Sequence, residues 1–266
     1  MSLPLEGQVA IVTGAFGRLG PLWCEALVDA GAAVVGLDLP TAQAPERFTA
    51  LERRAAGRLQ ALPADVRDRA SLVAARDRCA SETGVPSILV NNAGIDQPPG
   101  PATTYRIEDI PVEVFRGTVD VNLVGAFQAA QVFGPGMVQA GRGAIVNIGS
   151  LYASVSPDAR FYDHLPTDPP FLKPPAYGAS KAGLLNLTRY LATHWGPHGV
   201  RVNALSPGGV EGGQDPEFKR KFVGRVPLGR MASLDDLRGP LIFLASEASS
   251  YVTGIELRVD GGFTSW

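Results

Sequence analysis

The chain has 266 residues, of which 45% are hydrophobic and 19% are charged, and its formal net charge is -2. This composition is ordinary for a globular protein, and without a basic run it does not indicate nucleic acid as a partner. The apolar stretches are shorter than a bilayer requires, and the first residues, "MSLPLEGQVAIVTG", lack the features of a secretory signal. The sequence therefore predicts a cytoplasmic protein with no membrane partner.

Apolar runs rich in β-branched residues alternate with longer segments of helical pattern. The runs are too apolar to alternate between a buried and an exposed face, so they predict parallel strands covered on both sides. The predicted strands are 8–14, 32–38, 58–66, 87–94, 143–150, 200–208 and 255–262. The predicted helices include 18–30, 68–82, 112–133, 177–195 and 234–246. No linker-like segment interrupts this order, which predicts a single α/β domain over 1–266 with a doubly wound parallel sheet.

Metal-binding residue types do not cluster along the chain. Cys24 and Cys79 fall in separate helical patterns, and the three histidines are scattered. We expect both cysteines to be small buried hydrophobic residues, and we expect no metal site.

A glycine-rich turn, "VTGAFGRLG" (12–20), follows the first predicted strand. Gly14, Gly17 and Gly20 permit a tight turn and the close approach of a pyrophosphate, which the N-terminus of the next helix would favour. Asp38 ends the second strand, where a carboxylate can bind the ribose hydroxyls of adenosine or can cap a turn. A carboxylate there repels a 2′-phosphate, so the sequence predicts NAD, with NADP less favoured. Arg18, within the turn, is the one opposing feature.

Polar motifs follow the later apolar runs, at the strand ends where such sheets collect their ligand chemistry. They are "ADVRD" (64–68), "NNAG" (91–94), "DVNLVGAF" (120–127), "IVNIGS" (145–150), "YGASK" (177–181), "SPGG" (206–209) and "VDGG" (259–262). Tyr177 and Lys181 lie four positions apart on one helical face, about 5–6 Å apart at Cβ. An ammonium there would lower the pKa of the phenol, although an exposed pair on an amphipathic helix would have the same spacing.

Together these motifs resemble the short-chain dehydrogenase/reductase family along essentially the whole chain. The resemblance implies a Rossmann-type sheet of seven strands, a nicotinamide cofactor, a small-molecule substrate and a homotetramer or homodimer. It also implies that Tyr177 is the acid/base, that Lys181 holds the nicotinamide ribose and lowers the tyrosine pKa, and that Ser150 positions the substrate oxygen. Asn122 would hold a water that connects Lys181 to solvent. Tyr152 and Tyr162 are weaker candidates for the acid because neither has a lysine four residues later.

The same resemblance implies a set of cofactor contacts. They are Gly14, Phe16, Gly17, Arg18, Leu19, Asp38, Asp65, Val66, Asn92, Ala93, Gly94, Tyr177, Lys181, Pro207, Gly208 and Val210. Asp65 would bind the adenine amino group, with a solvated strand-end carboxylate as the alternative. Backbone groups near Val210 would hold the nicotinamide amide, because the threonine that many members carry after this turn is missing from "VEGG".

The chain departs from the usual pattern of the family in two places. Its glycine turn reads TGxxGxxG, which is commoner in the extended branch of epimerases and dehydratases, but the chain ends directly after its last predicted strand, as in short members. A proline-rich insertion occupies about 151–176, and a substrate lid is expected at about 209–230. Within the insertion, Arg160, Tyr162, Asp163 and His164 are candidates for substrate contacts or for surface and subunit contacts. The lid cations Lys219, Arg220, Lys221 and Arg225 could meet a carboxylate or form a solvated helix face.

Short-chain dehydrogenases of bacterial surface-sugar pathways are similar in the turn, the insertion, "SPGG" and the final tryptophan. The polar segments 95–105 and 208–222 also fit a substrate with several hydroxyls. The sequence therefore predicts an oxidoreductase that transfers a hydride between NAD and a secondary alcohol or ketone, with a polyhydroxylated or sugar-like substrate. The alternatives are a nucleotide-sugar epimerase or dehydratase with tightly held NAD and a non-catalytic dinucleotide-binding protein. The apolar end, 263–266, would suit burial against a neighbouring subunit.

Overall fold

The computed structural model describes residues 3–97, 99 and 105–266. In this part of the chain, seven parallel strands form one sheet in the order β3-β2-β1-β4-β5-β6-β7. The strands are β1 (Val9–Thr13), β2 (Ala33–Asp38), β3 (Leu59–Pro63), β4 (Ile88–Asn91), β5 (Gly143–Ile148), β6 (Val200–Pro207) and β7 (Glu256–Val259). The predicted single-domain, doubly wound α/β fold is therefore confirmed.

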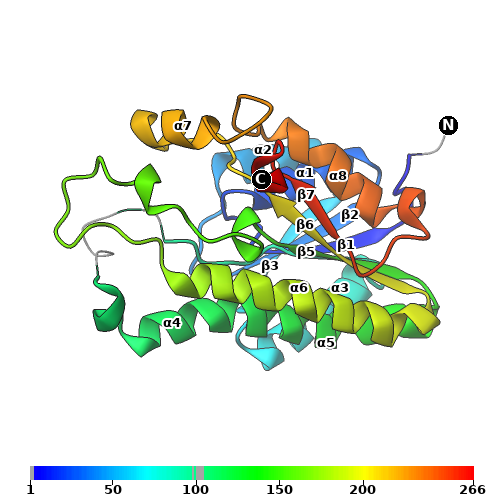
Figure 1. Cartoon of the computed structure of the whole chain (residues 1–266). Coiled ribbons are helices and arrows are strands. Elements are labelled where there is room, and N and C mark those ends of the chain that lie inside the picture. The colour runs from blue at the N-terminus through cyan, green and yellow to red at the C-terminus, as the bar shows by residue number, and fades with distance from the viewer. Residues whose placement is uncertain (1–2, 98, 100–104) are drawn as a thin grey trace.

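Helices cover both faces of the sheet, in two separate layers (Figure 1). One layer contains α1 (Gly20–Asp29), α2 (Glu46–Arg54) and α8 (Asp235–Ala245), whose buried side chains form one hydrophobic core with the sheet. The other contains α3 (Arg69–Glu82), α4 (Val112–Val119), α5 (Ala126–Ala140) and α6 (Pro175–Trp195), around a second core. Burial on both faces explains why the strands are apolar throughout: β4 is fully buried, and β1 is buried at every residue but its first.

The helix predicted at 112–133 consists of three pieces. A π-helical segment, Asp120–Gly125, joins α4 to α5. Helix α5 ends at Ala140 rather than at residue 133, because its C-cap, Gly141, takes the left-handed conformation at φ 66°. Helix α6 starts at Pro175, two residues before its predicted start, because proline is well suited to a first helical position. Helix α2 was not among the predicted helices, whereas α7 (Pro216–Val223) contains three of the four cations for which a helix face was one alternative.

Short 3₁₀ helices complete the secondary structure. They are Ile107–Asp109, Leu151–Ala153, Ala159–Phe161, Gly196–His198, Glu247–Ser249 and Phe263–Ser265. Cys24 and Cys79 are both buried and unpaired, as predicted. In the described part of the chain, no helix is both long and apolar enough to cross a membrane.

Residues 151–174 pack beside α7 and the C-terminal turn through a third hydrophobic cluster. This aromatic cluster contains Phe161, Tyr162, Phe171, Phe218, Phe222 and Phe263, with ring centroids 4.7–6.2 Å apart. Phe263 is therefore buried within the chain, whereas Trp266 remains 72% exposed. The cluster fixes the predicted insertion and the predicted lid against each other at one end of the sheet (Figure 1).

Candidate active site

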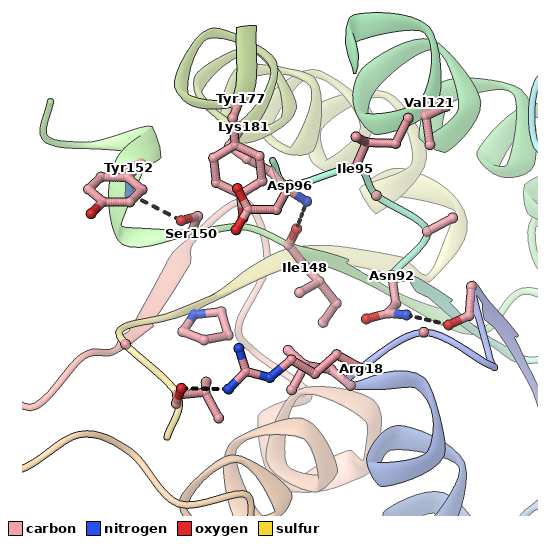
Figure 2. Close-up of a pocket in the computed structure, with 18 of the residues that line it drawn as sticks. Arg18, Asn92, Ile95, Asp96, Val121, Ile148, Ser150, Tyr152, Tyr177 and Lys181 are labelled. Atoms are coloured by element: carbon pink, nitrogen blue, oxygen red, sulfur yellow. Dashed lines mark hydrogen bonds between the residues drawn. The ribbon is translucent and has the colours of Figure 1, made fainter. Parts of the chain in front are cut away.

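A cavity of about 1210 Å³ opens at the carboxyl ends of the strands. Its lining comes from the segments that follow β1, β2, β3, β4, β5 and β6, together with α6. With the exception of Asn122, every residue in the predicted catalytic and cofactor sets lines this cavity. Asn122 lies behind the wall, at 1% exposure. The fold thus brings these residues together from strand ends far apart in the sequence (Figure 2).

The glycine turn has the shape of a cradle that side chains would fill. Gly14 has φ +64°, and a Cβ there would lie 2.7 Å from the Cα of Ala93. A Cβ at Gly20 would lie 2.4 Å from the carbonyl oxygens of Gly14 and Ala15. The N-cap of α1, Leu19, provides no side-chain cap, so the first N–H groups of this helix have no side-chain partner. Such a turn fits the pyrophosphate of a dinucleotide.

Asp38 lines the cavity, and its carboxylate also accepts hydrogen bonds from the glycine turn and from the residue after β2. Its Oδ2 accepts a hydrogen bond from the Phe16 N–H at 2.7 Å, and its Oδ1 accepts one from the Leu39 N–H at 2.8 Å. The two alternatives from the sequence, a turn cap and a ribose ligand, are therefore compatible with one position. Asp65 is held by a two-pronged hydrogen bond from Arg67, which lowers the pKa of that carboxyl.

Asn92 joins the end of β4 to the glycine turn. Its Nδ2 donates to the carbonyl oxygens of Thr13 and Gly14, and its Oδ1 accepts from Trp23 Nε1 at 2.8 Å (Figure 2). The N–H groups of Asn92 and Ala93 both donate to Thr13 Oγ1. Asn92 therefore shapes the cavity wall through its side chain, a role that its position after an apolar strand did not reveal.

Ser150, Tyr177 and Lys181 meet at the other end of the cavity. Lys181 is 4% exposed; its Nζ donates to the carbonyl oxygen of Ile148 at 2.7 Å and lies 5.9 Å from the centre of the Tyr177 ring. Burial lowers the pKa of Lys181 to about 8. The alternative reading of Lys181 as part of a solvated helix face is wrong.

The expectation that the lysine lowers the pKa of Tyr177 is not met. Burial raises the pKa of this phenol, the nearby Asp96 carboxylate raises it further, and a hydrogen bond with Ser150 acts in the opposite direction. Burial dominates because it disfavours the phenolate, and Lys181 is itself desolvated.

Asn122 lies in the π-helical segment, and its side-chain oxygen and nitrogen both have partners. Its Oδ1 accepts from the Ile95 N–H at 2.7 Å, and its Nδ2 donates to the Ile95 carbonyl oxygen and to Ser180 Oγ, both at 3.1 Å. The side chain thus holds the loop that carries Asp96. Both N–H groups of this amide are used, and Oδ1 keeps a second lone pair to which the predicted water could donate.

Arg18 spans the cavity from the glycine turn to the segment after β6. Its Nη2 donates to the carbonyl oxygens of Val210 at 2.7 Å and Glu211 at 2.9 Å (Figure 2). Gln214 also donates to the Val210 oxygen, so this carbonyl, which lies where backbone groups were expected to hold the nicotinamide amide, already has two donors. The Oε1 of Gln214 is buried and has no partner among the described residues.

The insertion candidates divide into two groups. Tyr162 and His164 line the cavity, whereas Asp163 pairs with Lys221 and Arg160 pairs with Asp158, both outside the lining. Each lid cation also has a carboxylate partner within the chain: Lys219 with Glu211, Arg220 with Glu217, Lys221 with Asp163 and Arg225 with Asp158.

Asp96 and Lys173 also line the cavity, and neither was predicted from the sequence as a site residue. Asp96 lies in the polar segment 95–105, of which residues 98 and 100–104 are outside the described part of the chain. Lys173 precedes Tyr177 by four residues, and this spacing is the feature of the sequence that could have indicated a lysine near the tyrosine.

Comparison with known proteins assigns the family. The profile described as "short chain dehydrogenase" matches residues 8–162. The chain belongs to the short-chain dehydrogenase family. A second profile, described as "Enoyl-(Acyl carrier protein) reductase", matches residues 168–264. This short-chain dehydrogenase is therefore an NAD(P)-dependent oxidoreductase, and the glycine cradle described above fits such a cofactor.

Curated relatives of this short-chain dehydrogenase cover nearly its full length. It is 35% identical to D-threitol dehydrogenase of Mycolicibacterium smegmatis, over 98% of this chain and 94% of that protein. It is 35% identical to galactitol 2-dehydrogenase of Rhizobium johnstonii, over 98% and 97%, respectively. It is 33% identical to 2-dehydro-3-deoxy-D-gluconate 5-dehydrogenase of Escherichia coli, over 97% and 96%.

Solved structures share the fold of this short-chain dehydrogenase. A gluconate 5-dehydrogenase from Burkholderia cenocepacia, in complex with NADP and tartrate, superimposes with a TM-score of 0.82 at 31% identity, covering 100% of this chain and 98% of that one. A short-chain dehydrogenase from Leptospira borgpetersenii with bound NAD+ gives a TM-score of 0.83 at 32% identity, covering 98% and 94%. Both dinucleotides thus occur among similar proteins.

Proposed function

We propose that this enzyme oxidises one secondary hydroxyl of a polyhydroxylated, sugar-like substrate to a ketone, with NAD as the acceptor. Relatives that act on threitol, galactitol and a gluconate derivative support this class of substrate. The cavity offers several polar side chains, among them Ser150 and Asp96 near Tyr177 and His164 elsewhere in the lining, which suits a ligand with many hydroxyls.

The proposed chemistry divides between the cofactor and the chain. When bound, NAD supplies the hydride acceptor, so the protein has to orient the reactants and manage one proton. Tyr177 first loses its own proton to solvent, with the charges of Lys181 and of the oxidised nicotinamide favouring the phenolate against burial, and then takes the proton of the substrate hydroxyl as its base. Ser150, which lines the cavity beside Tyr177, holds the same oxygen. Lys181 holds the nicotinamide ribose, and Asn122 keeps Ile95 and the adjoining loop in place.

One observation carries the proposal. Ser150, Tyr177 and Lys181 lie across the cavity from Arg18 of the glycine turn (Figure 2), and Asp38 lines the same cavity. Such an arrangement would place a dinucleotide along the strand ends and a carbinol beside the phenol.

The experiment that tests the function measures NADH formation by absorbance across a panel of polyols, sugars, sugar acids and hydroxysteroids. We expect turnover with polyhydroxylated compounds and none with hydroxysteroids. Turnover confined to hydroxysteroids, or no turnover with any compound, would contradict the proposal.

We propose NAD rather than NADP because Asp38 faces the position where a 2′-phosphate would lie, and the nearby cations are engaged. Arg67 is paired with Asp65, and Arg18 donates to two carbonyl oxygens. A direct comparison of kcat/KM with the two dinucleotides tests this choice.

We further propose a cytoplasmic homotetramer, or failing that a homodimer. The exposed Trp266 and Leu228, at 72% and 70%, offer apolar surface for a second copy, and the two unpaired cysteines fit a reducing compartment. Light scattering after size-exclusion chromatography and cell fractionation test the two parts separately.

A further inference from the structure

The relatives leave the charge of the substrate open, because threitol and galactitol are neutral and a gluconate derivative is an anion. The charges that line the cavity near Tyr177 address this question. The cavity is lined by five basic side chains: Lys173 and Lys181, which lie beside the Tyr177 ring, and His164, Arg18 and Arg67. None of the residues outside the described part of the chain is basic, so the sequence adds no further lysine, arginine or histidine.

Each of these basic groups is already engaged: Arg18 donates to two backbone carbonyl oxygens, and Arg67 pairs with Asp65. Lys173 forms an ion pair with Asp96, and His164 Nε2 lies 2.8 Å from Asp215 Oδ1. Lys181 is buried and donates to the Ile148 carbonyl oxygen at 2.7 Å. The lid cations beyond the cavity are paired in the same way. A substrate carboxylate would therefore have to compete with a partner that each cation already has, which is a protein carboxylate for Lys173 and His164 and a backbone carbonyl for Lys181.

The Asp96–Lys173 pair lies beside Tyr177, the proposed acid/base. The Lys173 Nζ lies 5.3 Å from the centre of the Tyr177 ring, and the lysine side chain is only 6% exposed. The Asp96 side chain is 52% exposed, and its charge acts on both Tyr177 and Lys181. Figure 2 shows Asp96 on the same side of the cavity as Tyr177 and Lys181, across from Arg18. Only Oδ1 of Asp96 is used in the hydrogen bond with Lys173.

We propose that the Asp96–Lys173 pair makes this enzyme selective for uncharged polyols over aldonates, the corresponding sugar acids. Asp96 accepts hydrogen bonds from substrate hydroxyls next to the carbon that is oxidised, and its negative charge repels a carboxylate. Lys173 neutralises part of that charge and holds Asp96 in place, so it does not itself serve as a carboxylate receptor. The inference rests on the proposed function, because it names the substrate class of the same site.

The test compares three compounds of one carbon chain and configuration: a polyol, its aldonate and its aldonamide. The aldonamide has nearly the shape of the aldonate without the charge, so it separates electrostatic repulsion from steric fit. For the unaltered enzyme with NAD, we expect kcat/KM for the aldonate to be at least about tenfold below the values for the polyol and the aldonamide.

Two variants should move the polyol-to-aldonate ratio in opposite directions. Asp96→Asn removes the repelling charge and leaves Lys173 unpaired, so the ratio should fall at least about tenfold. Lys173→Met leaves Asp96 uncompensated, so the ratio should rise. A ratio measured within one variant does not depend on the fraction of folded enzyme, and a purely structural role would not move it in opposite directions.

Asp163→Asn is the matched control. It makes the same chemical change and also removes a carboxylate partner of a lysine, Lys221, which keeps Glu217 at 3.7 Å, and neither Asp163 nor Lys221 lines the cavity. Its ratio should equal that of the unaltered enzyme.

The inference is overturned if the unaltered enzyme prefers the aldonate, if the aldonamide is rejected as strongly as the aldonate, or if both variants shift the ratio in one direction. In each of these cases the proposed function still stands. If no polyhydroxylated compound is oxidised at all, the proposed function fails and takes this inference with it.

Discussion

The ammonium of Lys181 lies 5.9 Å from the centre of the Tyr177 ring, one turn further along the same helix. Both residues lie in the wall of one cavity, and the lysine is held by a backbone carbonyl of the neighbouring strand, that of Ile148. The phenol of Tyr177 and the ammonium of Lys181 are thus held together in a desolvated site, where their pKa values respond strongly to neighbouring charges.

Tyr177→Phe should abolish turnover and leave the affinity for NAD nearly unchanged. The substitution removes the group that exchanges the proton and keeps the ring that fills the wall, so we expect a loss of at least about 100-fold in kcat. Steady-state kinetics and a fluorescence titration with NADH measure the two effects. Retention of activity would remove the tyrosine from its assigned role, and Tyr152→Phe serves as the comparison.

Lys181→Met should change the pH dependence of stability of the cofactor-free protein. Burial lowers the pKa of Lys181 from 10.5 to about 8. The charged lysine therefore costs stability fully below pH 8, and this cost diminishes as the pH rises toward 10.5. Relative to the variant, the unaltered protein should gain about 2 kcal/mol between about pH 7.5 and about pH 9.5.

Urea unfolding of both proteins at the two pH values tests this sign. Lys219→Met removes a more exposed lysine, at 31% side-chain exposure, and should show a much smaller difference. The prediction is contradicted if the free energy of unfolding of the unaltered protein falls, relative to that of Lys181→Met, between about pH 7.5 and about pH 9.5.

Asp38→Ala should narrow the preference for NAD over NADP by about 10-fold or more, because a carboxylate at the end of β2 repels a 2′-phosphate. The readout is the ratio of kcat/KM values with the two dinucleotides. This ratio is insensitive to a general loosening of the turn, which the loss of the Phe16 and Leu39 hydrogen bonds would also cause. An unaltered enzyme that already prefers NADP would refute the role given to this carboxylate.

Arg18→Ala should loosen the segment after β6. The guanidinium donates two hydrogen bonds to carbonyl oxygens 192 and 193 positions away, and no other part of the glycine turn is bonded to that segment among the described residues. We expect amide hydrogen exchange in residues 211–223 of the cofactor-free protein to become several-fold to about tenfold faster. Arg78→Ala, which breaks a surface pair with Glu82, should leave this segment unchanged.

Gly14→Ala should destabilise the protein by about 2–4 kcal/mol. The residue has a left-handed backbone conformation, and the new Cβ would meet the backbone of Ala93 at 2.7 Å. Gly117→Ala is the opposite case: it lies within α4 with nothing within 4 Å of the added Cβ, so it should stabilise by about 0.5–1 kcal/mol. Equal effects in urea unfolding would contradict the account of the turn.

The sequence by itself determined the order of strands and helices along the chain and the edge of the sheet at which the candidate site residues lie. Buried parallel strands require continuous apolar runs, and the carboxyl ends of such strands meet at one edge of the sheet. For this reason the positions of Gly14, Asp38, Asn92, Ser150 and Pro207 after apolar runs were enough to assign them to one cavity. Helix α2 was not predicted because it is short, with nine residues, and only Phe48 and Leu51 of them are buried.

Only the tertiary structure decided the electrostatics of that cavity. The pKa of Tyr177 is raised rather than lowered because the phenol is buried and the Asp96 carboxylate lies near it. Segments remote from α6 provide both the burial and the carboxylate. The same holds for the pair of Asp96 with Lys173 and for the reach of Arg18 across the cavity. Local spacing predicts which residue types meet, but desolvation and long-range pairing depend on how distant segments pack.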